Sequence, residues 1–378
     1  MKKILIVNDN LHLGGIQKAL VNMLKEIHDE YEITLLLLNK RGELLSEIPN
    51  DVNVVGACKT ISVLGAYKKE LKENIAGYIW KGILVLLARK SSKKFAFQFA
   101  AIMQKKIGIT YDVAISYSHP SKEHDLRSCS AEFVLKKINA KKKICFVHAD
   151  YQNESNRSTY TDSIYKQFDG IACCSESVRN HFVGALPDDT DKVSVVRNFY
   201  DLSLQLNDGQ APYQYDNSYI NIVSIARLTT EKGISRAVEA LYQSGRKDIR
   251  YYIVGEGPKR KELEAEIAEY KLADKVFLLG ESTYPYAYMK SADYLLVSSF
   301  HEAAPMVFDE AKLLGLKVIT TNTTSAMEMI GTEYGVVCEN SMEGIRDILT
   351  GLQRTKAGQK TEYNNGTQQM QFAELVQK

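Results

Sequence analysis

The chain has little of several features that would assign it to a specialised class of protein. It has six cysteines in 378 residues, and none stands in a C-x-x-C pair or beside a histidine cluster, so neither a zinc site nor a disulfide framework is indicated. It has no G-x-G-x-x-G motif, the phosphate-binding signature of nicotinamide and flavin proteins. The apolar run Ile4–Val7 is too short for a signal-peptide core, and Ile75–Ala88, interrupted by Lys81, is too short to span a bilayer. The formal charge of only +2 disfavours a dedicated duplex-DNA binder. We therefore expect a cytoplasmic protein that binds no nucleic acid.

What the chain does have is a repeated alternation of short apolar runs and amphipathic stretches. The apolar runs are unbroken, which is typical of strands buried on both faces of a parallel sheet. In the first half of the chain they fall at Lys3–Val7, Ile33–Leu38, Asp112–Ser116, Ile144–Val147, Gly170–Cys173 and Val193–Val196. In the second half they fall at Asn221–Ile225, Tyr251–Val254, Lys275–Leu279, Tyr294–Val297, Val318–Thr321 and Val336–Cys338. The series therefore predicts two doubly wound α/β domains, each with a parallel sheet and right-handed crossovers.

A polar segment over residues 198–219 divides the two series. It is rich in Asn, Asp, Gln and Tyr, shows no periodicity and contains a proline, as is typical of a linker. We therefore predict an N-terminal domain over residues 1–199 and a C-terminal domain over residues 200–378. The polar tail after about residue 351 contains one weak helix at Gln368–Val376, and it is a candidate to pack back on the first domain.

The first candidate for ligand binding is the glycine pair Gly14–Gly15, which follows the strand Lys3–Val7. Glycines between a strand and a helix allow the backbone to approach a ligand closely, and the N–H groups of the following helix can bind an anion. The alternative is a plain strand-to-helix turn.

Two cations follow the first strand of the second domain. Arg227 comes directly after this strand, and Lys232 is expected in the first turn of the following helix. A lysine there faces the positive end of the helix dipole, which is unfavourable unless an anion binds between the cations and the helix. These residues therefore favour a phosphate site, and a solvated Lys232 paired with Glu231 is the alternative.

The segment Ser298–Ala311 carries the strongest signal in the chain. Pro305 suits the first position of a helix. This position leaves three N–H groups to face the crevice, those of Met306, Val307 and Phe308. Glu302 lies in the loop before the helix, and Glu310 is expected a little over two turns inside it. Carboxylates beside a phosphate site are suited to accept hydrogen bonds from sugar and ribose hydroxyls.

Together these residues make the chain resemble a family 4 glycosyltransferase over nearly its whole length. The resemblance rests on the order and spacing of Gly14–Gly15, Arg227 with Lys232–Gly233, Gly255–Pro258 and the E-x7-E pair Glu302 and Glu310. It implies the GT-B fold, with two Rossmann-like domains facing across a cleft, and sugar transfer from a nucleotide donor with retention of configuration. Ala303 stands where the family usually has a glycine, and a positive φ there would strain the loop.

The resemblance also implies roles for single residues. Arg227 and Lys232 hold the donor diphosphate, Glu310 accepts the ribose hydroxyls, and Glu302 contacts the donor sugar. His148, after the strand Ile144–Val147, matches the active-site histidine of the first domain. The other donor-binding residues lie in the glycine turns and at the start of the helix near Pro305: Gly14, Gly15, Gly255, Ala304, Pro305, Met306 and Val307.

No metal or other cofactor is expected at this site. Asp189–Asp191 forms a D-x-D sequence, the metal motif of the other main glycosyltransferase fold, but it lies in the polar stretch Pro187–Lys192 and not at the end of a buried strand. Two cations and a helix dipole would make a divalent ion dispensable. The nucleotide is expected to be uridine diphosphate, on family frequency alone.

The sequence therefore predicts a retaining glycosyltransferase of capsule or exopolysaccharide biosynthesis. Its substrates would be a nucleotide-sugar donor and a glycan acceptor, expected to be linked to a polyisoprenyl diphosphate. Two alternatives stand beside this prediction. One is a nucleotide-sugar epimerase or a phosphorylase, and the other is a non-catalytic GT-B subunit that assists another transferase.

Positive charge is concentrated in one region of the first domain. Residues 66–106 have a net charge of +8, and six aromatic residues lie among their lysines and arginines. The run Ile83–Leu87, flanked by Lys81 and Arg89–Lys90, is suited to lie in a membrane interface with its cations toward anionic head groups. The alternative is an ordinary buried helix over Ile75–Leu87. We expect a peripheral protein on the inner face of the cell membrane, bound to its anionic surface.

Overall fold

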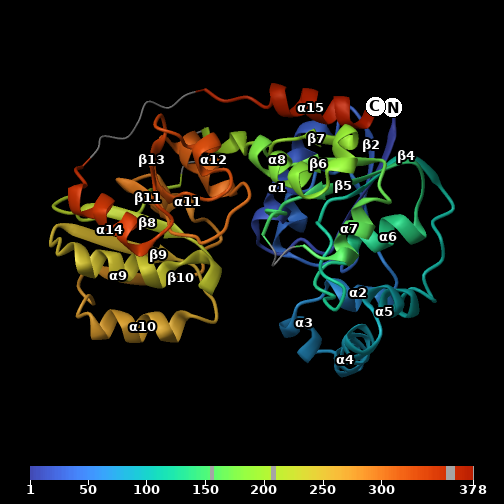
Figure 1. Cartoon of the computed structure of the whole chain (residues 1–378), viewed down its shortest axis with the longest axis horizontal. Helices are drawn as coiled ribbons and strands as arrows, with labels where there is room; N and C mark the ends of the chain where they lie inside the picture. Colours follow the sequence, from blue (N-terminus) through green and yellow to red (C-terminus); the bar gives the residue numbers. More distant parts are fainter. Residues whose placement is uncertain (154–156, 206–209, 355–361, 378) are drawn as a thin grey trace. The chain divides into compact units, whose positions relative to one another are not determined.

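The structure is a computed structural model that describes residues 1–153, 157–205, 210–354 and 362–377 (Figure 1). The chain divides into two compact units. One comprises Met1–Phe199 and Asn365–Lys378, and the other comprises Tyr200–Asn364. Each unit contains one parallel sheet.

The first unit is built on a seven-stranded sheet with the order β3-β2-β1-β4-β5-β6-β7. Every pairing in it is parallel. The strands are β1 (Lys3–Asn8), β2 (Glu32–Leu37), β3 (Asn53–Gly56), β4 (Thr110–Ser116), β5 (Asn139–Val147), β6 (Gly170–Cys173) and β7 (Val193–Val195). The central strand β1 is fully buried over Ile4–Val7, as its unbroken apolar run requires.

Helices connect these strands and cover the sheet. They are α1 (Gly15–Ile27), α2 (Lys59–Gly65), α3 (Lys68–Lys72), α4 (Ile75–Lys90), α5 (Lys93–Ala100), α6 (Ser130–Lys137), α7 (Thr159–Tyr165) and α8 (Glu176–Ala185). The connection from β3 to β4 contains four of them, α2 to α5, so the basic region 66–106 lies in a helical insertion. Within the described ranges, no helix is sufficiently long and apolar to cross a membrane.

The last helix of the chain, α15 (Gly366–Gln377), belongs to the first unit. Its apolar residues Phe372, Leu375 and Val376 are buried. The Nζ of Lys142 donates to the carbonyl of Leu375 at 2.6 Å, and the Nζ of Lys2 donates to the carbonyl of Val376 at 2.9 Å. Cations at a helix C-terminus stabilise its unpaired carbonyl groups.

The second unit has a six-stranded sheet with the order β10-β9-β8-β11-β12-β13. Its strands are β8 (Ile220–Ile225), β9 (Ile249–Val254), β10 (Val276–Gly280), β11 (Tyr294–Val297), β12 (Lys317–Thr321) and β13 (Gly335–Cys338). Its helices are α9 (Ile234–Ser244), α10 (Arg260–Glu269), α11 (Tyr286–Met289), α12 (Met306–Leu314), α13 (Ala326–Met329) and α14 (Met342–Gly351). Alternate residues of β9 face opposite sides: Tyr251 packs with α9, α10 and α14, and Tyr252 packs with α11, α12 and α13.

The prediction of two doubly wound α/β domains is confirmed, and all twelve predicted strands are present. The sequence pattern misses β3, a short strand at the edge of its sheet with no fully buried residue. A strand exposed in this way needs no apolar run, so it leaves no signal.

The strand order reverses beside the first strand of each sheet. The reversal lies between β1 and β4 in the first unit and between β8 and β11 in the second. In sheets of this kind, ligands bind outside the carboxyl ends of the strands at this point. The predicted donor-binding residues of the second unit all follow β8, β9 or β11.

Candidate active site

The loop after β8 carries Arg227 and contacts the turn after β9. Arg227 is exposed. Gly255, directly after β9, has a φ of 150°, and a Cβ there would lie 1.9 Å from the carbonyl oxygen of Ala226. Only glycine therefore allows this approach. The N–H of Leu228 donates to the carbonyl of Glu256 at 2.9 Å, which joins the two loops at the carboxyl edge of the sheet.

Lys232 lies just before α9. The prediction that it lies in the first turn of this helix is wrong, because Thr230–Lys232 form a 3-10 turn that ends at Gly233, and α9 begins one residue later. Gly233 has a φ of 60°, and a Cβ there would lie 2.1 Å from the carbonyl oxygen of Ser298. The close contact with the loop after β11 thus requires a glycine at this position. Its left-handed backbone conformation separates the 3-10 turn from α9. Lys232 remains beside the positive end of α9.

Lys232 and Glu302 form an ion pair across 70 residues of sequence. The Nζ of Lys232 lies 2.5 Å from Oε1 of Glu302, and the hydroxyl of Ser299 donates to the same oxygen at 2.7 Å. The two charged side chains are 27% and 13% exposed, so water screens the pair only partly. Lys232 therefore pairs with Glu302 and not with its sequence neighbour Glu231. The fold brings together two of the predicted site residues.

Arg236, in α9, holds the loop that carries Glu302. Its Nε donates to the carbonyl of Ser298 at 2.8 Å, and its Nη2 donates to the carbonyl of Ser299 at 2.7 Å. Its guanidinium carbon lies 3.8 Å from the ring centroid of Phe300. Burial lowers the pKa of Arg236 below its usual value, but a guanidinium stays charged in proteins. A buried cation thus fixes the backbone of this loop, and no sequence motif marks it.

The helix after this loop begins one residue later than predicted. Pro305 is the N-cap residue of α12 and has an extended conformation. The N–H of Phe308, predicted to be free, donates to the carbonyl of Pro305 at 3.1 Å. The amides of Met306 and Val307 precede this bond and remain at the open end of the helix. Glu310 is the fifth residue of α12, so it lies about one turn inside the helix and not two.

The residues Ala303 and Ala304 fit this loop without backbone strain. Among the described residues, Lys271 is the only non-glycine with a positive φ. Ala303 therefore has a backbone conformation that any residue adopts, and the missing glycine does not distort the loop before α12.

Glu310 is contacted by a tyrosine that no sequence motif marks. The hydroxyl of Tyr286 donates to Oε1 of Glu310 at 2.9 Å. Tyr286 is the first residue of α11, and only 8% of it is exposed. Its contact with α12 depends on how the two helices pack on the sheet, so no local pattern could have found it.

In the first unit, buried polar groups hold the loop after β1. The side-chain amide of Asn8 donates to the carbonyl of Asn10 at 2.8 Å, and the hydroxyl of Ser118 donates to Oδ1 of Asn8 at 2.5 Å. The loop leads to Gly14, the N-cap residue of α1, and to Gly15, the first residue of this helix. Both glycines are exposed, so the N-terminus of α1 opens at the carboxyl edge of the sheet.

His148 follows β5 at the same edge. Its ring centroid lies 4.8 Å from that of Tyr117 and 5.7 Å from that of Phe146. Its Nε2 is enclosed and has no hydrogen-bond partner among the described residues. Burial, assisted by the nearby His119, lowers the pKa of His148 to about 3. Burial likewise lowers the pKa of His119 to about 4. Both imidazoles are therefore neutral at pH 7.

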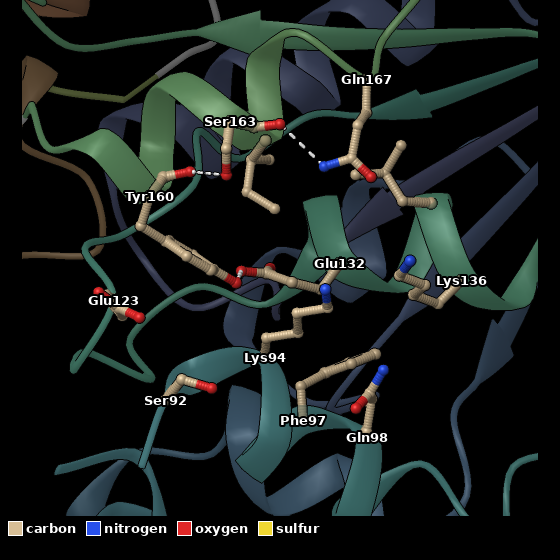
Figure 2. A pocket seen from close by; sticks show the side chains of 12 residues that line it. Ser92, Lys94, Phe97, Gln98, Glu123, Glu132, Lys136, Tyr160, Ser163 and Gln167 are labelled. Atoms are coloured by element: carbon tan, nitrogen blue, oxygen red, sulfur yellow. Dashed lines mark hydrogen bonds between the residues drawn. The ribbon is translucent and has the colours of Figure 1, made fainter. Parts of the chain in front are cut away.

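A separate pocket lies among α5, α6 and α7 (Figure 2). The hydroxyl of Tyr160 donates to Oε1 of Glu132 at 2.9 Å, and the Nζ of Lys93 lies 2.9 Å from the same oxygen. Lys93 is completely buried. Burial alone would lower its pKa, but the charge of Glu132 raises it overall. Lys93, one of the cations of the basic region 66–106, is thus part of a buried ion pair. Glu132 and Leu135 of α6 and Tyr160 of α7 line the pocket, together with Gln167 just after α7.

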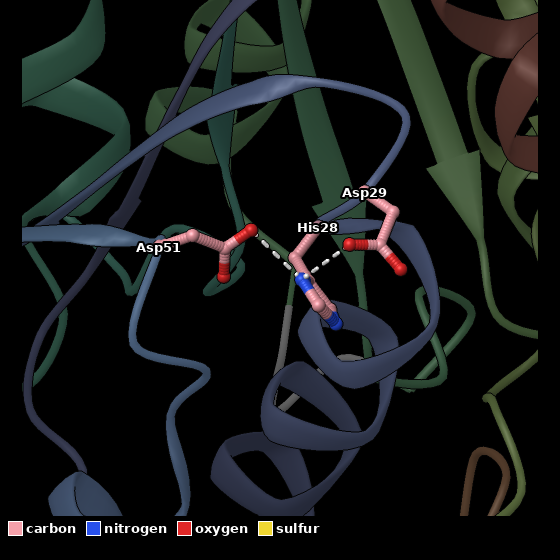
Figure 3. Close-up of side chains that lie close together, drawn as sticks. All are labelled: His28, Asp29 and Asp51. Carbon is pink, nitrogen blue, oxygen red and sulfur yellow. Dashed lines mark hydrogen bonds and ion pairs between the residues drawn. The ribbon is translucent and has the colours of Figure 1, made fainter.

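The acidic clusters do not lie at either carboxyl edge. The D-x-D segment Asp189–Asp191 is in a 3-10 turn before β7, and Asp189 pairs with Lys192 at 2.9 Å. One group in the described part of the chain has ligand atoms near enough for a metal ion: His28, Asp29 and Asp51 (Figure 3). Both carboxylates contact the same atom, Nδ1 of His28, at 3.2 and 2.9 Å. They form a surface ion-pair cluster at the C-terminus of α1.

Comparison with known proteins places the second unit in a family. Residues 211–363 match the model of the family described as "Glycosyl transferases group 1". A Campylobacter jejuni protein named N-acetylgalactosamine-N,N'-diacetylbacillosaminyl-diphospho-undecaprenol 4-alpha-N-acetylgalactosaminyltransferase is 33% identical over 143 residues, which cover 36% of this chain and 39% of that protein. The amylovoran biosynthesis glycosyltransferase AmsK of Erwinia amylovora is 27% identical over 183 residues, covering 42% and 45%. The chain thus spans about two fifths of the length of these curated relatives.

The fold extends the likeness to nearly the whole chain. The crystal structure of Anabaena Alr3699/HepE in complex with UDP and glucose superposes with a TM-score of 0.66 at 15% sequence identity, and covers 93% of this chain and 89% of that one. The two doubly wound sheets and this likeness define the GT-B fold. Residues 211–363, which lie in the second unit, match the group 1 glycosyltransferases, and the curated relatives of the chain include an exopolysaccharide biosynthesis enzyme.

Proposed function

We propose that the protein is a retaining, metal-independent glycosyltransferase that moves a sugar from a nucleotide-diphosphate donor to a lipid-linked glycan in surface polysaccharide biosynthesis. The observation that carries this proposal is the set of charges at the carboxyl edge of the second unit. Arg227, Lys232 and the N-terminus of α12 supply positive charge there, beside the carboxylates of Glu302 and Glu310. A diphosphate is bound by cations and free amides, and sugar hydroxyls are bound by carboxylates.

The ion pair between Lys232 and Glu302 couples the two halves of donor recognition. Lys232 holds Oε1 of Glu302 at 2.5 Å. A diphosphate that takes over Lys232 releases this oxygen for a sugar hydroxyl, while the bond from Ser299 keeps the carboxylate oriented. The diphosphate thereby prepares Glu302 for the sugar that it carries.

The chemical step requires that the bond between the anomeric carbon and the phosphate oxygen breaks. Negative charge then builds up on the departing diphosphate, where Arg227, Lys232 and the amides of Met306 and Val307 stabilise it. The acceptor hydroxyl forms the new bond from the face that the nucleotide leaves, and it passes its proton to the departing phosphate. Holding the acceptor in line with the anomeric carbon supplies a further part of the rate enhancement.

His148 is suited to hydrogen bonding and not to proton transfer. Its pKa of about 3 makes the imidazole far too weak a base to hold a proton near pH 7. In this proposal the departing phosphate, and not His148, accepts the proton of the acceptor.

The charge at the site and the names of relatives support the class of donor and acceptor. Arg227, Lys232 and the helix N-terminus oppose the two charges of a diphosphate, so no divalent cation is needed for neutralisation. The Anabaena protein is complexed with UDP and glucose, which supports a UDP-sugar. The name of the Campylobacter relative contains diphospho-undecaprenol, which supports a polyisoprenyl-diphosphate acceptor.

An exposed apolar surface supports docking on a membrane. On α4, Ile75, Ile79 and Leu86 are 74%, 57% and 56% exposed, and their spacing places them along one face of the helix. The alternative that Ile75–Leu87 is an ordinary buried helix is therefore wrong for this face. Other apolar residues of α4, α5 and the segment after α5 are also exposed: Tyr78, Ile83, Phe95, Phe99, Ile102 and Met103. Apolar exposure on this scale marks an interaction site.

Exposed cations border this surface. Arg89, Lys90 and Lys94 are exposed, whereas Lys81 turns inward and donates to the carbonyl of Ala66 at 2.7 Å. Apolar side chains bordered by cations are suited to an anionic lipid surface. We propose that the first unit docks here on the inner face of the cell membrane, where a lipid-linked acceptor is available.

A screen of nucleotide sugars tests the proposed reaction. The purified chain is incubated with UDP-, GDP- and ADP-sugars in the presence of EDTA, and donor hydrolysis and transfer to polyisoprenyl-diphosphate-linked acceptors are measured. We expect turnover of one donor in EDTA and, by NMR, a product with the anomeric configuration of the donor. Turnover that depends on added metal, or an inverted product, would refute the corresponding part of the proposal. No turnover of any donor would favour a non-catalytic subunit.

Sedimentation with vesicles tests membrane docking. The wild type should pellet with vesicles of anionic lipid at low salt, and the triple variant Arg89→Glu, Lys90→Glu and Lys94→Glu should remain in the supernatant. The matched control reverses three exposed lysines elsewhere on the chain: Lys166, Lys247 and Lys261. Equal pelleting of the triple variant and the wild type would remove this surface from the proposal.

A further inference from the structure

Tyr286 and Glu310 meet across two helices that pack on the same face of the second sheet. The hydroxyl of Tyr286, in α11, donates to Oε1 of Glu310, in α12, at 2.9 Å. The ring of Tyr286 is buried in the apolar cluster that also contains Phe308. Packing restricts the motion of a buried ring, so the hydroxyl of Tyr286 is held at a defined position beside the carboxylate of Glu310.

A carboxylate that binds two vicinal hydroxyls must present its oxygens in one orientation. Glutamate has three side-chain torsions, and fixing them on binding has an entropic cost. A hydrogen bond from a rigid donor to Oε1 fixes the carboxylate before the ligand arrives. Pre-organisation of this kind raises affinity without adding a contact to the ligand.

We propose that Tyr286 is a positioning residue that orients Glu310 for the ribose hydroxyls of the donor nucleotide. This inference rests on the proposed function, in which Glu310 accepts those hydroxyls. Tyr286 itself touches no part of the ligand in this arrangement. Its effect is therefore limited to the part of the binding free energy that depends on the ribose hydroxyls.

The neighbouring Tyr284 offers a matched control. Its ring lies 5.3 Å from that of Tyr286 and meets it edge-on, but its hydroxyl accepts a bond from Nζ of Lys290 at 2.8 Å. Replacing either tyrosine by phenylalanine removes one hydroxyl and keeps the ring packing. The replacement of Tyr286 removes its bond to Glu310.

The test measures nucleotide binding by calorimetry, so that it does not depend on turnover. UDP, GDP and ADP are compared with their 2′,3′-dideoxy analogues on the wild type, Tyr286→Phe and Tyr284→Phe. We expect Tyr286→Phe to raise the Kd of the preferred ribonucleotide by about fivefold and that of its dideoxy analogue by less than twofold. Tyr284→Phe should keep the full preference of the wild type for the ribonucleotide. In a Glu310→Gln background, Tyr286→Phe should have no further effect on this preference.

The possible results separate this inference from the proposed function. An equal loss of affinity for both nucleotides in Tyr286→Phe, or no loss for either, would overturn the positioning role while nucleotide binding stands. Failure of the folded wild type to bind any of the three nucleotides would overturn the proposed function, and the inference with it. Thermal unfolding of each variant checks that the comparison is made between folded proteins.

Discussion

Replacing Lys232 by alanine removes the central charge of the proposed diphosphate site. A charge-assisted hydrogen bond contributes about 1.5–3 kcal/mol, so its loss should lower kcat/KM for the donor by roughly 10- to 150-fold. The folded state should change little, because the pair with Glu302 is partly exposed and a pair of this kind contributes about 1 kcal/mol or less. The assay is the initial rate of donor hydrolysis or transfer over a range of donor concentrations.

Lys259→Ala is the matched control for this prediction. Lys259 also forms a lysine–glutamate pair at 2.5 Å, with Glu262, but on an exposed helix of the same unit. Its replacement should leave kcat/KM within about twofold of the wild type. The role of Lys232 would be refuted if Lys232→Ala retained more than a third of the wild-type kcat/KM, or if Lys259→Ala lost as much.

Three further predictions concern Gly233 beside Lys232, the buried pair of Lys93 and Glu132, and the buried ring of His148. Gly233→Ala should destabilise the protein by about 2–4 kcal/mol in urea unfolding, because the new Cβ meets the backbone of the loop after β11. The control Gly245→Ala, also at a positive φ but in open space, should cost about 1 kcal/mol. Similar losses of stability in both variants would show that the contact with this loop is not the cause. Lys93→Met should lower the free energy of unfolding by about 3–5 kcal/mol, because Glu132 then lacks its buried partner. Adding Glu132→Gln to the same chain should restore more than half of that loss. Additive losses in the double variant would count against a coupled pair. The free energy of unfolding should fall as the pH drops below about 6.5, because the unfolded chain protonates His148 and the folded chain does not until about pH 3. His148→Asn should reduce this slope by up to ~1.4 kcal/mol per pH unit, and an unchanged slope would show that the ring is not held neutral.

The sequence by itself determined the architecture and the residue types of the proposed site. Short unbroken apolar runs are typical of strands in a sheet covered on both faces, so their alternation with amphipathic stretches indicated two doubly wound units. Cations, glycines and carboxylates placed directly after strands specified a carboxyl edge suited to a phosphate and to hydroxyls. These signals are local, because each depends on residues within about one strand and one helix.

Helix boundaries were less well determined, because a contact from another part of the chain decides them. Gly233 adopts a left-handed conformation since the carbonyl of Ser298 lies where a side chain would be, and this contact ends the turn that carries Lys232. The residues around Gly233 do not indicate which loop packs against it. β3 left no apolar signal for a different reason, because it is only partly buried at an edge of its sheet.

Only the tertiary structure decided which partners the charged and polar side chains take. Lys232 could pair with its neighbour Glu231, but the fold presents Glu302 to it at 2.5 Å. Lys93 and Lys94 are adjacent in sequence, yet one is buried against Glu132 and the other is exposed, because neighbouring positions on a helix point about 100° apart. A pairing is set by the distance between side chains after packing, and residues far apart in sequence acquire that distance only when the sheet and its helices have formed.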